Sequence, residues 1–373
     1  MENENENKSE NMEVDSDTSK LISTNMYNKN DSTEEEIERG NSDVSGLGFK
    51  NLNKIHNSNS FGLKSKFATK DSSNPKTIES INETNDSLNI SNIDKKESKP
   101  IIQKKISHKN LNYLYNVEYF DEIFTNLLLD EQNLKSKIKK DYMIKQNDIN
   151  DKMRAILVDW IIEVHYRYHF KRKTLYQTIT IIDLYLSNKI ISKIKLQLLG
   201  IASLLISCKD NEIHYPGIKE FIHITNYAYK KYDLLEMEIH VLDILNFEIL
   251  APSADEFYNI LSKFFNFNKE QKFLGEYFMD SSLVDYNMLK YNPSIIAMAC
   301  SYIVMKFYGI NKYKDLFSSK IKIGDSSQKA IKECAKDLCF LVKNLSHSSL
   351  RATKKKYTLE QFGKVAKIIN EKK

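Results

Sequence analysis

The side chains that could carry chemistry in this chain are four cysteines and a few charged residues set in apolar segments. The cysteines show no CxxC pairing and no histidine at the spacing of a zinc site, which favours buried free thiols. The chain has no Walker A sequence, GxGxxG turn or GxSxG elbow, and its 10 glycines leave few loops that could cradle phosphate. We therefore expect no catalytic residue, no metal and no cofactor. The cysteines are Cys208, Cys300, Cys334 and Cys339.

A second group of polar side chains lies within residues 153–165, where Arg154, Asp159 and Glu163 interrupt an apolar run. At about 100° per residue on a helix, these positions divide the apolar surface into two sectors. The pattern predicts a helix that is either buried on all sides or shows one apolar stripe to a partner. One sector carries Ala155, Val158 and Ile162 and can face a core, and the other carries Met153, Leu157, Trp160 and Val164 with Ile156 beside it.

Composition and charge narrow the classes of partner. The 55 basic and 50 acidic residues leave a net charge of only +5, and the two signs are interspersed, so we expect no nucleic-acid partner. The densest basic run, at residues 351–356, is interpreted as solvated surface. No apolar stretch reaches the roughly 20 residues that span a bilayer, and the N-terminus lacks the apolar core of a secretory signal. We predict a soluble intracellular protein without a membrane partner.

Helices must position these residues. Residues 1–110 are rich in Asn, Ser, Lys, Glu and Asp without an apolar period, which predicts a disordered regulatory tail. Residues 111–150 carry apolar side chains every three or four positions, followed by a polar stretch, which predicts an amphipathic helix and a linker. Helical periods dominate beyond that point. We expect helices near 153–168, 173–187, 193–209, 216–226 and 229–246.

A domain boundary is expected near Pro252, because Ser253 and Glu256 form the capping-box pattern that starts a new helix. Residues 198–209 are apolar all round, and residues 295–306 repeat their pattern of small and apolar side chains. This repeat predicts two copies of one helical domain, each built around a central helix. The predicted all-α chain has a tail at 1–110, a helix and linker at 111–150, and domains at 151–250 and 251–373.

These residues resemble the mitotic A/B-type group of the cyclin family, with the B-type the nearer of the two. Met153-Arg-Ala-Ile-Leu-Val-Asp-Trp-Ile-Ile-Glu-Val164 is similar to the opening of the family's first cyclin box. Thr174-Leu-Tyr176, Lys195-Leu-Gln-Leu-Leu-Gly200 and Met237-Glu238 follow at the family's spacing. The resemblance covers residues 111–373. It implies two tandem five-helix cyclin boxes, preceded by an N-terminal helix and a disordered tail.

The resemblance also implies a function and the residues that perform it. The family's members are non-catalytic subunits that bind and activate a cyclin-dependent serine/threonine kinase, recruit substrates and control the G2/M step and mitosis, in the nucleus and cytoplasm. Arg154 and Asp183 fall on a pair expected to lock the first two helices together, because a lone buried charge would be strongly destabilising. The positions implied to bind the kinase are Lys209, Glu238 and Glu212 in the first box and Tyr119 and Ile123 in the N-terminal helix. The alternative for Lys209 and Glu238 is a local pair between the two side chains.

The same family carries a groove that docks Arg-x-Leu motifs of substrates and inhibitors. Glu163 is placed to pair with the arginine of such a motif. For the apolar stripe of residues 153–165 we prefer this docking role to plain core packing, because the other apolar sector already supplies a core face. The matching groove positions are Met153, Ile156, Leu157, Trp160, Glu163, Leu196 and Gln197.

One residue departs from the family's pattern, and two other functions are alternatives to kinase activation. Asp210 stands where the family has an aromatic residue expected to pack on the kinase, so the strength of kinase binding is open. A transcription-type cyclin is one alternative, although such proteins generally lack the opening seen at residues 153–157. A nucleic-acid-binding cyclin-fold transcription factor is the other, and it usually carries an N-terminal zinc ribbon. No cysteine precedes Cys208, which excludes that ribbon.

Overall fold

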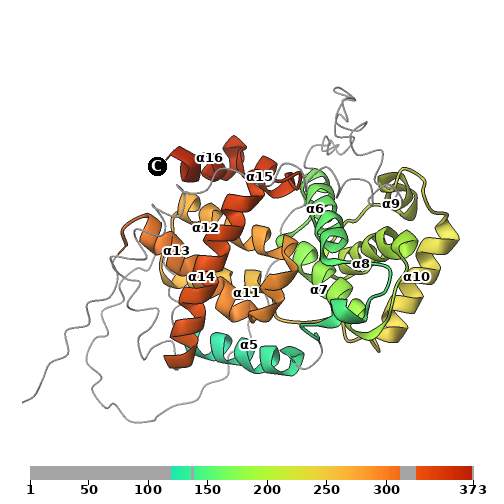
Figure 1. The fold of residues 1–373 in the computed structure, drawn as a ribbon, viewed down its shortest axis with the longest axis horizontal. Helices are drawn as coiled ribbons and strands as arrows, with labels where there is room; N and C mark the ends of the chain where they lie inside the picture. The colour runs from blue at the N-terminus through green and yellow to red at the C-terminus, as the bar shows by residue number, and fades with distance from the viewer. Residues whose placement is uncertain (1–118, 136–137, 311–324, 372–373) are drawn as a thin grey trace, which may run out of the picture.

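The computed structural model describes residues 119–135, 138–310 and 325–371. Throughout these residues the secondary structure is helical and no strand occurs, which confirms the all-α prediction. The helices form two groups that lie side by side, one around α8 and one around α13, with α5 along the edge of the second group (Figure 1). The predicted tail at residues 1–110 lies outside the described residues.

The first group follows the expected helices closely. Its first helix begins where the Asn150 side chain accepts a hydrogen bond from the backbone N–H of Met153, and it ends at His169, whose φ of 56° is left-handed. The central helix α8 is buried among its neighbours over most of its length, as its apolar sequence predicted. The group comprises α6 (Asp151–Tyr168), α7 (Arg172–Asn188), α8 (Leu196–Asn211), α9 (Ile218–Ile224) and α10 (Lys231–Ile244).

The second group begins with the expected capping box. The Ser253 hydroxyl accepts a hydrogen bond from the backbone N–H of Glu256, and the Glu256 carboxylate accepts one from the Ser253 backbone N–H. Pro293 occupies the first turn of the central helix α13, where its missing N–H costs nothing. The group comprises α11 (Ala254–Phe264), α12 (Lys269–Val284), α13 (Pro293–Phe307), α14 (Asp325–Leu345), α15 (Ala352–Tyr357) and α16 (Val365–Glu371).

The N-terminal helix α5 (Phe120–Lys135) packs on the second group, against α11 and α13. The ring of Phe120 stacks on that of Phe264 with centroids 4.3 Å apart, and Phe124 meets Phe257 edge to face. At the other end of the helix, both carboxylate oxygens of Glu131 accept hydrogen bonds from Ser294, one from its N–H and one from its hydroxyl. A side chain of α5 therefore caps the first turn of α13.

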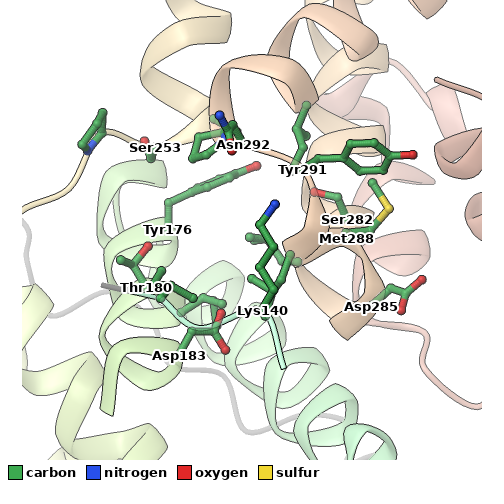
Figure 2. A pocket seen from close by; sticks show the side chains of 18 of the residues that line it. Lys140, Tyr176, Thr180, Asp183, Ser253, Ser282, Asp285, Met288, Tyr291 and Asn292 are labelled. Atoms are coloured by element: carbon green, nitrogen blue, oxygen red, sulfur yellow. The ribbon is translucent and has the colours of Figure 1, made fainter. Parts of the chain in front are cut away.

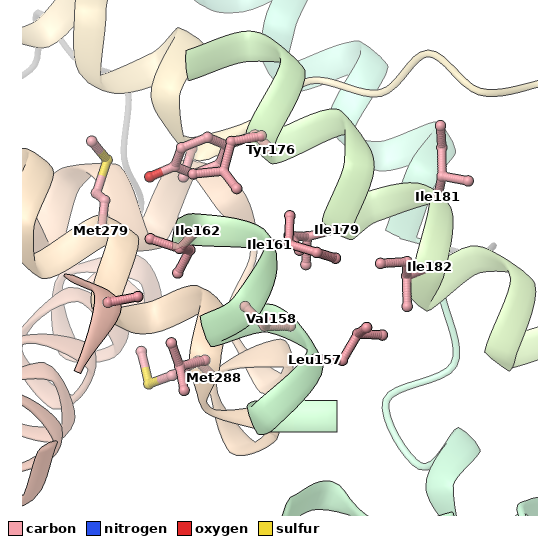
Figure 3. Close-up of a cluster of buried hydrophobic side chains, with 14 of the residues drawn as sticks. Leu157, Val158, Ile161, Ile162, Tyr176, Ile179, Ile181, Ile182, Met279 and Met288 are labelled. Atoms are coloured by element: carbon pink, nitrogen blue, oxygen red, sulfur yellow. The ribbon is translucent and has the colours of Figure 1, made fainter. Parts of the chain in front are cut away.

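The core runs without interruption from one group into the other. Figure 3 shows Leu157 and Ile161 of α6 beside Ile182 of α7, while Met279 and Met288 of the second group lie on the opposite side of α6. α6 packs against α8, α12 and α15 as well as α7. The apolar sector of residues 153–165 that was predicted to stay exposed is buried instead, because Leu157 of that sector packs on α8 while Val158 and Ile162 of the other sector face the second group.

Candidate functional site

The pair Arg154 and Asp183 lies at the junction of the two groups. Two guanidinium nitrogens of Arg154 donate to the two carboxylate oxygens of Asp183, each over 2.7 Å, and both side chains are buried. The Tyr142 hydroxyl donates to the same carboxylate, and the third guanidinium nitrogen donates to the backbone oxygen of Leu283. Burial disfavours the charge on Arg154, but Asp183 outweighs it and raises the pKa of the guanidinium. The arginine thus joins α6, α7, the linker and the second group, whereas the sequence indicated only its bond to α7.

Lys209 and Glu238 meet where α8 ends beside α10. The ammonium nitrogen of Lys209 lies 2.5 Å from a carboxylate oxygen of Glu238, whose side chain is buried, while the lysine stem is half-exposed. An apolar stripe at helical spacing runs along the adjacent face of α10. Tyr232 and Ile239 of this stripe are exposed, and Leu235 and Leu242 are half-buried. The site is a charged pair beside a solvent-facing apolar stripe, which suits a protein partner rather than a small ligand.

The other residues expected to bind a kinase have different surroundings. One carboxylate oxygen of Glu212 accepts hydrogen bonds from the Lys171 N–H and the Thr174 hydroxyl, so Glu212 holds the first turn of α7. Tyr119, just before α5, and Ile123 of α5 are each 44% exposed. Glu212 therefore has a structural role in the free chain, and the two residues near the start of α5 remain accessible.

The predicted docking stripe requires a correction. Its central residues are buried, with Leu157 and Leu196 at 0% exposure and Trp160 at 5%. Leu157 cannot face solvent because its side chain fills the space above Gly200, where an added Cβ would lie 2.7 Å from its nearest methyl group. Met153 is buried as well, and among the expected groove residues only Ile156 and Glu163 keep partial exposure.

One polar atom beside this stripe is unusual. Gln197 is buried at the start of α8, and its side-chain oxygen has no hydrogen-bond partner among the described residues. A buried acceptor without a donor costs free energy, about 1 to 3 kcal/mol, unless a bound molecule supplies one. Glu163 is paired with Arg167 over 2.9 Å, but the arginine is half-exposed and such surface pairs exchange readily. The side chains of Gln197 and Glu163 could therefore each accept a hydrogen bond from a bound peptide.

A charged cluster that the sequence analysis did not predict joins α7 to the second group. Arg172 donates to Asp255 over 2.6 Å and to Asp280 over 2.9 Å, and it also reaches the Tyr357 hydroxyl. Lys356 contacts the same Asp280 from α15, over 2.7 Å. Burial would raise the pKa of Asp280, but the two cations hold it well below its usual range. The only signal in the sequence was a basic residue at the start of a helix, and its partners lie up to 185 positions away.

A cavity of about 120 Å³ opens where the linker meets both groups of helices. Figure 2 shows Lys140 projecting into it, with Tyr176 and Thr180 on one side and Ser282 and Met288 on the other. The Lys140 ammonium donates to the backbone oxygen of Lys290, and most of the wall is apolar. The cavity therefore lies along the seam between the two groups, and the Lys140 ammonium in it is already hydrogen bonded.

Burial keeps the thiols of the four cysteines protonated. Burial raises the pKa of the Cys208, Cys300 and Cys334 thiols, and that of Cys339 to about 12, so none is a thiolate near neutral pH. In the part of the chain that the structure describes, no His, Cys, Asp and Glu side chains group together as a metal site. The same residues include no helix with the length and apolar character needed to cross a membrane.

Comparisons with known proteins match this architecture. Residues 122–250 match the family model described as "Cyclin, N-terminal domain", and residues 252–371 match "Cyclin, C-terminal domain". A crystal structure of a viral cyclin from herpesvirus saimiri superposes with a TM-score of 0.51 at 18% identity, covering 58% of this chain and 96% of the viral one. That likeness shows the fold.

Curated relatives are similar over the same region. Cyclin-B2-2 of Oryza sativa subsp. indica is 34% identical over 260 residues, which is 69% of this chain and 60% of the relative. The G2/mitotic-specific cyclin-B of Dictyostelium discoideum is 34% identical over 252 residues, and that of Spisula solidissima is 33% identical over 253, each covering 67% of this chain and 57% of the relative. The chain thus spans less than two thirds of the length of these relatives.

Proposed function

Because the chain belongs to the cyclin family, with relatives of the B type, we propose that it is a non-catalytic regulatory subunit of a cyclin-dependent serine/threonine kinase. In this proposal it activates the kinase, recruits substrates and acts in the nucleus and cytoplasm at the G2/M step and in mitosis. The observation that carries the proposal is the Lys209 and Glu238 pair beside the exposed apolar stripe of α10.

The stripe and the pair suit a helix of a partner. Tyr232, Leu235, Ile239 and Leu242 follow one face of α10 at the i, i+3, i+7 and i+10 positions, so a second helix can lie along them. Lys209 and Glu238 border this face. Their ion pair could be replaced by hydrogen bonds from each side chain to backbone groups at the end of the partner helix. A protein kinase must hold one mobile helix inward to complete the ion pair that positions nucleotide.

Activation then follows from differential binding. A surface that fits only the inward position of that helix raises the population of the active kinase without performing any chemistry. Moving the population from 1:99 to 99:1 requires about 5.5 kcal/mol of preferential affinity. The face of α10 alone is small, so we propose that Tyr119 and Ile123 of α5 extend the contact.

For substrate recruitment we propose a shallower groove than the sequence indicated. Leu157 and Leu196 form a buried floor, since neither has exposed surface. Ile156 and Glu163 supply the accessible rim, and the unpartnered oxygen of Gln197 would accept an N–H from the backbone of a docked peptide. An Arg-x-Leu peptide offers the matching groups, with its arginine toward Glu163.

The test of activation uses the full chain co-expressed with a cyclin-dependent kinase from its own cell. Lys209→Ala with Glu238→Ala should lower both pull-down of the kinase and its activity on a short peptide by tenfold or more, about 1.4 kcal/mol. Lys290→Ala with Asp337→Ala is the matched control, because it removes an exposed pair of 2.6 Å in the second group. Full activation by the first variant would refute the proposed kinase interface.

Substrate docking is tested separately. Glu163→Ala with Gln197→Ala should raise the KM for a substrate bearing an Arg-x-Leu motif and leave the KM for a short peptide unchanged. These changes avoid Trp160, whose truncation would damage the core because the ring is buried. An equal rise for both substrates would show that the groove plays no part in recruitment.

A further inference from the structure

An unusual surface of the first group lies at the N-terminal end of α8, where three isoleucines project into solvent. Ile144 is 84% exposed, Ile194 is 73% exposed and Ile190 is also exposed. A single exposed apolar side chain is common in folded proteins, but several on one surface often mark a binding site. We refer to these isoleucines and the lysines around them as the lysine–isoleucine surface.

Hydrogen bonds fix the two segments that carry these isoleucines. The Gln146 side chain donates to the backbone oxygens of Leu186 and Lys189 and accepts from the N–H of Ile191. The Asp148 carboxylate accepts from the N–H of Lys193. The linker and the loop between α7 and α8 therefore lie side by side. The three isoleucines share a preformed platform.

The same platform carries an excess of positive charge. The Tyr229 hydroxyl donates to the backbone oxygen of Ile194, which brings the start of α10 to its edge. Asp148 and Asp233 each accept a backbone N–H and keep their negative charge, so they offset only part of the positive charge of the lysines around the isoleucines. Lysine side chains surround the isoleucines at Lys145, Lys189, Lys193, Lys195, Lys230 and Lys231. An occupant should therefore combine several carboxylates with an aliphatic side chain.

Residues 10–17 and residues 31–43 both have this composition, and the second segment carries more carboxylates. Residues 31–43, Asp-Ser-Thr-Glu-Glu-Glu-Ile-Glu-Arg-Gly-Asn-Ser-Asp, hold six carboxylates and one arginine around Ile37. The 75 residues from 44 to 118 separate this segment from α5. At about 3.3 Å per residue they can span more than 200 Å, so the segment can reach any part of the surface. Covalent attachment also gives it a high effective concentration there.

We propose that residues 31–43 bind the lysine–isoleucine surface of the same chain, with Ile37 against the isoleucines and its acidic neighbours against the lysines. The exposed basic run at residues 351–355 is a weaker site for this segment, because it presents no exposed aliphatic side chain. The surface borders Leu196 and Gln197, so the bound segment would compete with ligands of the proposed docking groove. The proposal does not depend on kinase binding.

The test uses methyl NMR of the full chain with labelled isoleucines and a nitroxide attached at Asn41→Cys, in a Cys339→Ser background. The methyl signals of Ile144, Ile190 and Ile194 should lose most of their intensity relative to the reduced label. Ile213 is the matched control, because it is 82% exposed but lies beyond the far end of α8, roughly 24 Å away. Its signal should be retained.

Charge variants complete the experiment. Changing Glu34, Glu35, Glu36 and Glu38 to Gln, or adding about 0.5 M salt, should restore the three signals, since screening shortens the range of the attraction. Lys189→Gln with Lys195→Gln should do the same, whereas Lys329→Gln with Lys336→Gln on α14 should not. Equal loss at Ile213, or loss that survives the glutamine changes, would overturn the proposal. Loss caused only by added phosphatidylserine vesicles would also overturn it and identify a membrane surface instead.

Discussion

Arg172→Met should destabilise the chain through the charged cluster between α7 and the second group. The arginine side chain is one-fifth exposed, while Asp255 and Asp280, which accept its hydrogen bonds, are buried. Methionine keeps the apolar stem and removes the positive charge. Asp280 would retain Lys356 at 2.7 Å, but Asp255 would lose its only ion pair in the described part of the chain.

Removing one partner of a buried ion pair typically costs about 3 to 5 kcal/mol. We expect about 3 kcal/mol here, because Lys356 continues to neutralise Asp280. Urea unfolding followed by circular dichroism would measure the loss as a change in midpoint. Lys173→Met is the matched control, because the neighbouring lysine is half-exposed and lies 3.7 Å from Glu256. Its cost should stay below about 0.5 kcal/mol.

The pH dependence of the loss tests its cause. The low pKa of Asp280 stabilises the wild-type chain above the unfolded pKa of about 3.9, and that contribution disappears as the pH falls through the folded value. Without Arg172 the folded pKa of Asp280 rises toward the unfolded value, so the difference between wild type and Arg172→Met should hold from pH 7 to pH 4 and shrink as the pH falls further. A difference that stays constant below pH 4, or a loss no larger than that of Lys173→Met, would refute the electrostatic explanation.

Three further predictions concern single contacts. Burial raises the pKa of Asp159 to about 6, so the protonated carboxyl stabilises the folded chain below pH 4, and this contribution is lost as the pH rises to 6. Asp159→Asn should remove this pH dependence. It should also stabilise the chain at pH 7 by up to about 3 kcal/mol, measured by denaturant titration. Gly275→Ala should lower the thermal midpoint strongly, because the new methyl group would overlap the buried ring of Tyr258, which has no room to move. Glu131→Ala should cost about 1 to 2 kcal/mol by uncapping Ser294 and should release α5, which faster amide exchange in that helix would reveal.

The helices could be predicted from the sequence because each signal is local. The capping box of Ser253 and Glu256, and the apolar period of α6, depend on residues within a few turns. Which side of α6 is exposed could not be predicted in this way. Its polar positions suggested an open stripe, but Leu157 of that stripe packs on Gly200 of α8, which lies more than 40 positions along the chain.

The candidate site likewise contains some residues that could be predicted from the sequence and others that could not. Lys209 and Glu238 meet between two helices that pack together, and the resemblance to the family implied both residues. The cluster around Arg172 brings together residues from α7, α11, α12 and α15, which no periodicity relates. Gln197 was expected in the groove, but its missing hydrogen-bond partner becomes visible only when its burial is known.

Three hydrogen-bonded links hold the two groups of helices together, and each starts on α6 or α7. Arg154 reaches the backbone of Leu283, Arg172 reaches Asp280, and Asp159 accepts the N–H of Ala352 over 2.9 Å. The stripe on α10 belongs to the first group, whereas α5 is held by the second, so a kinase that uses both must find them in a fixed relation. Rigid positioning lowers the ordering cost of binding. Loosening the Arg172 link should therefore weaken kinase activation even though no residue on the proposed kinase interface is changed.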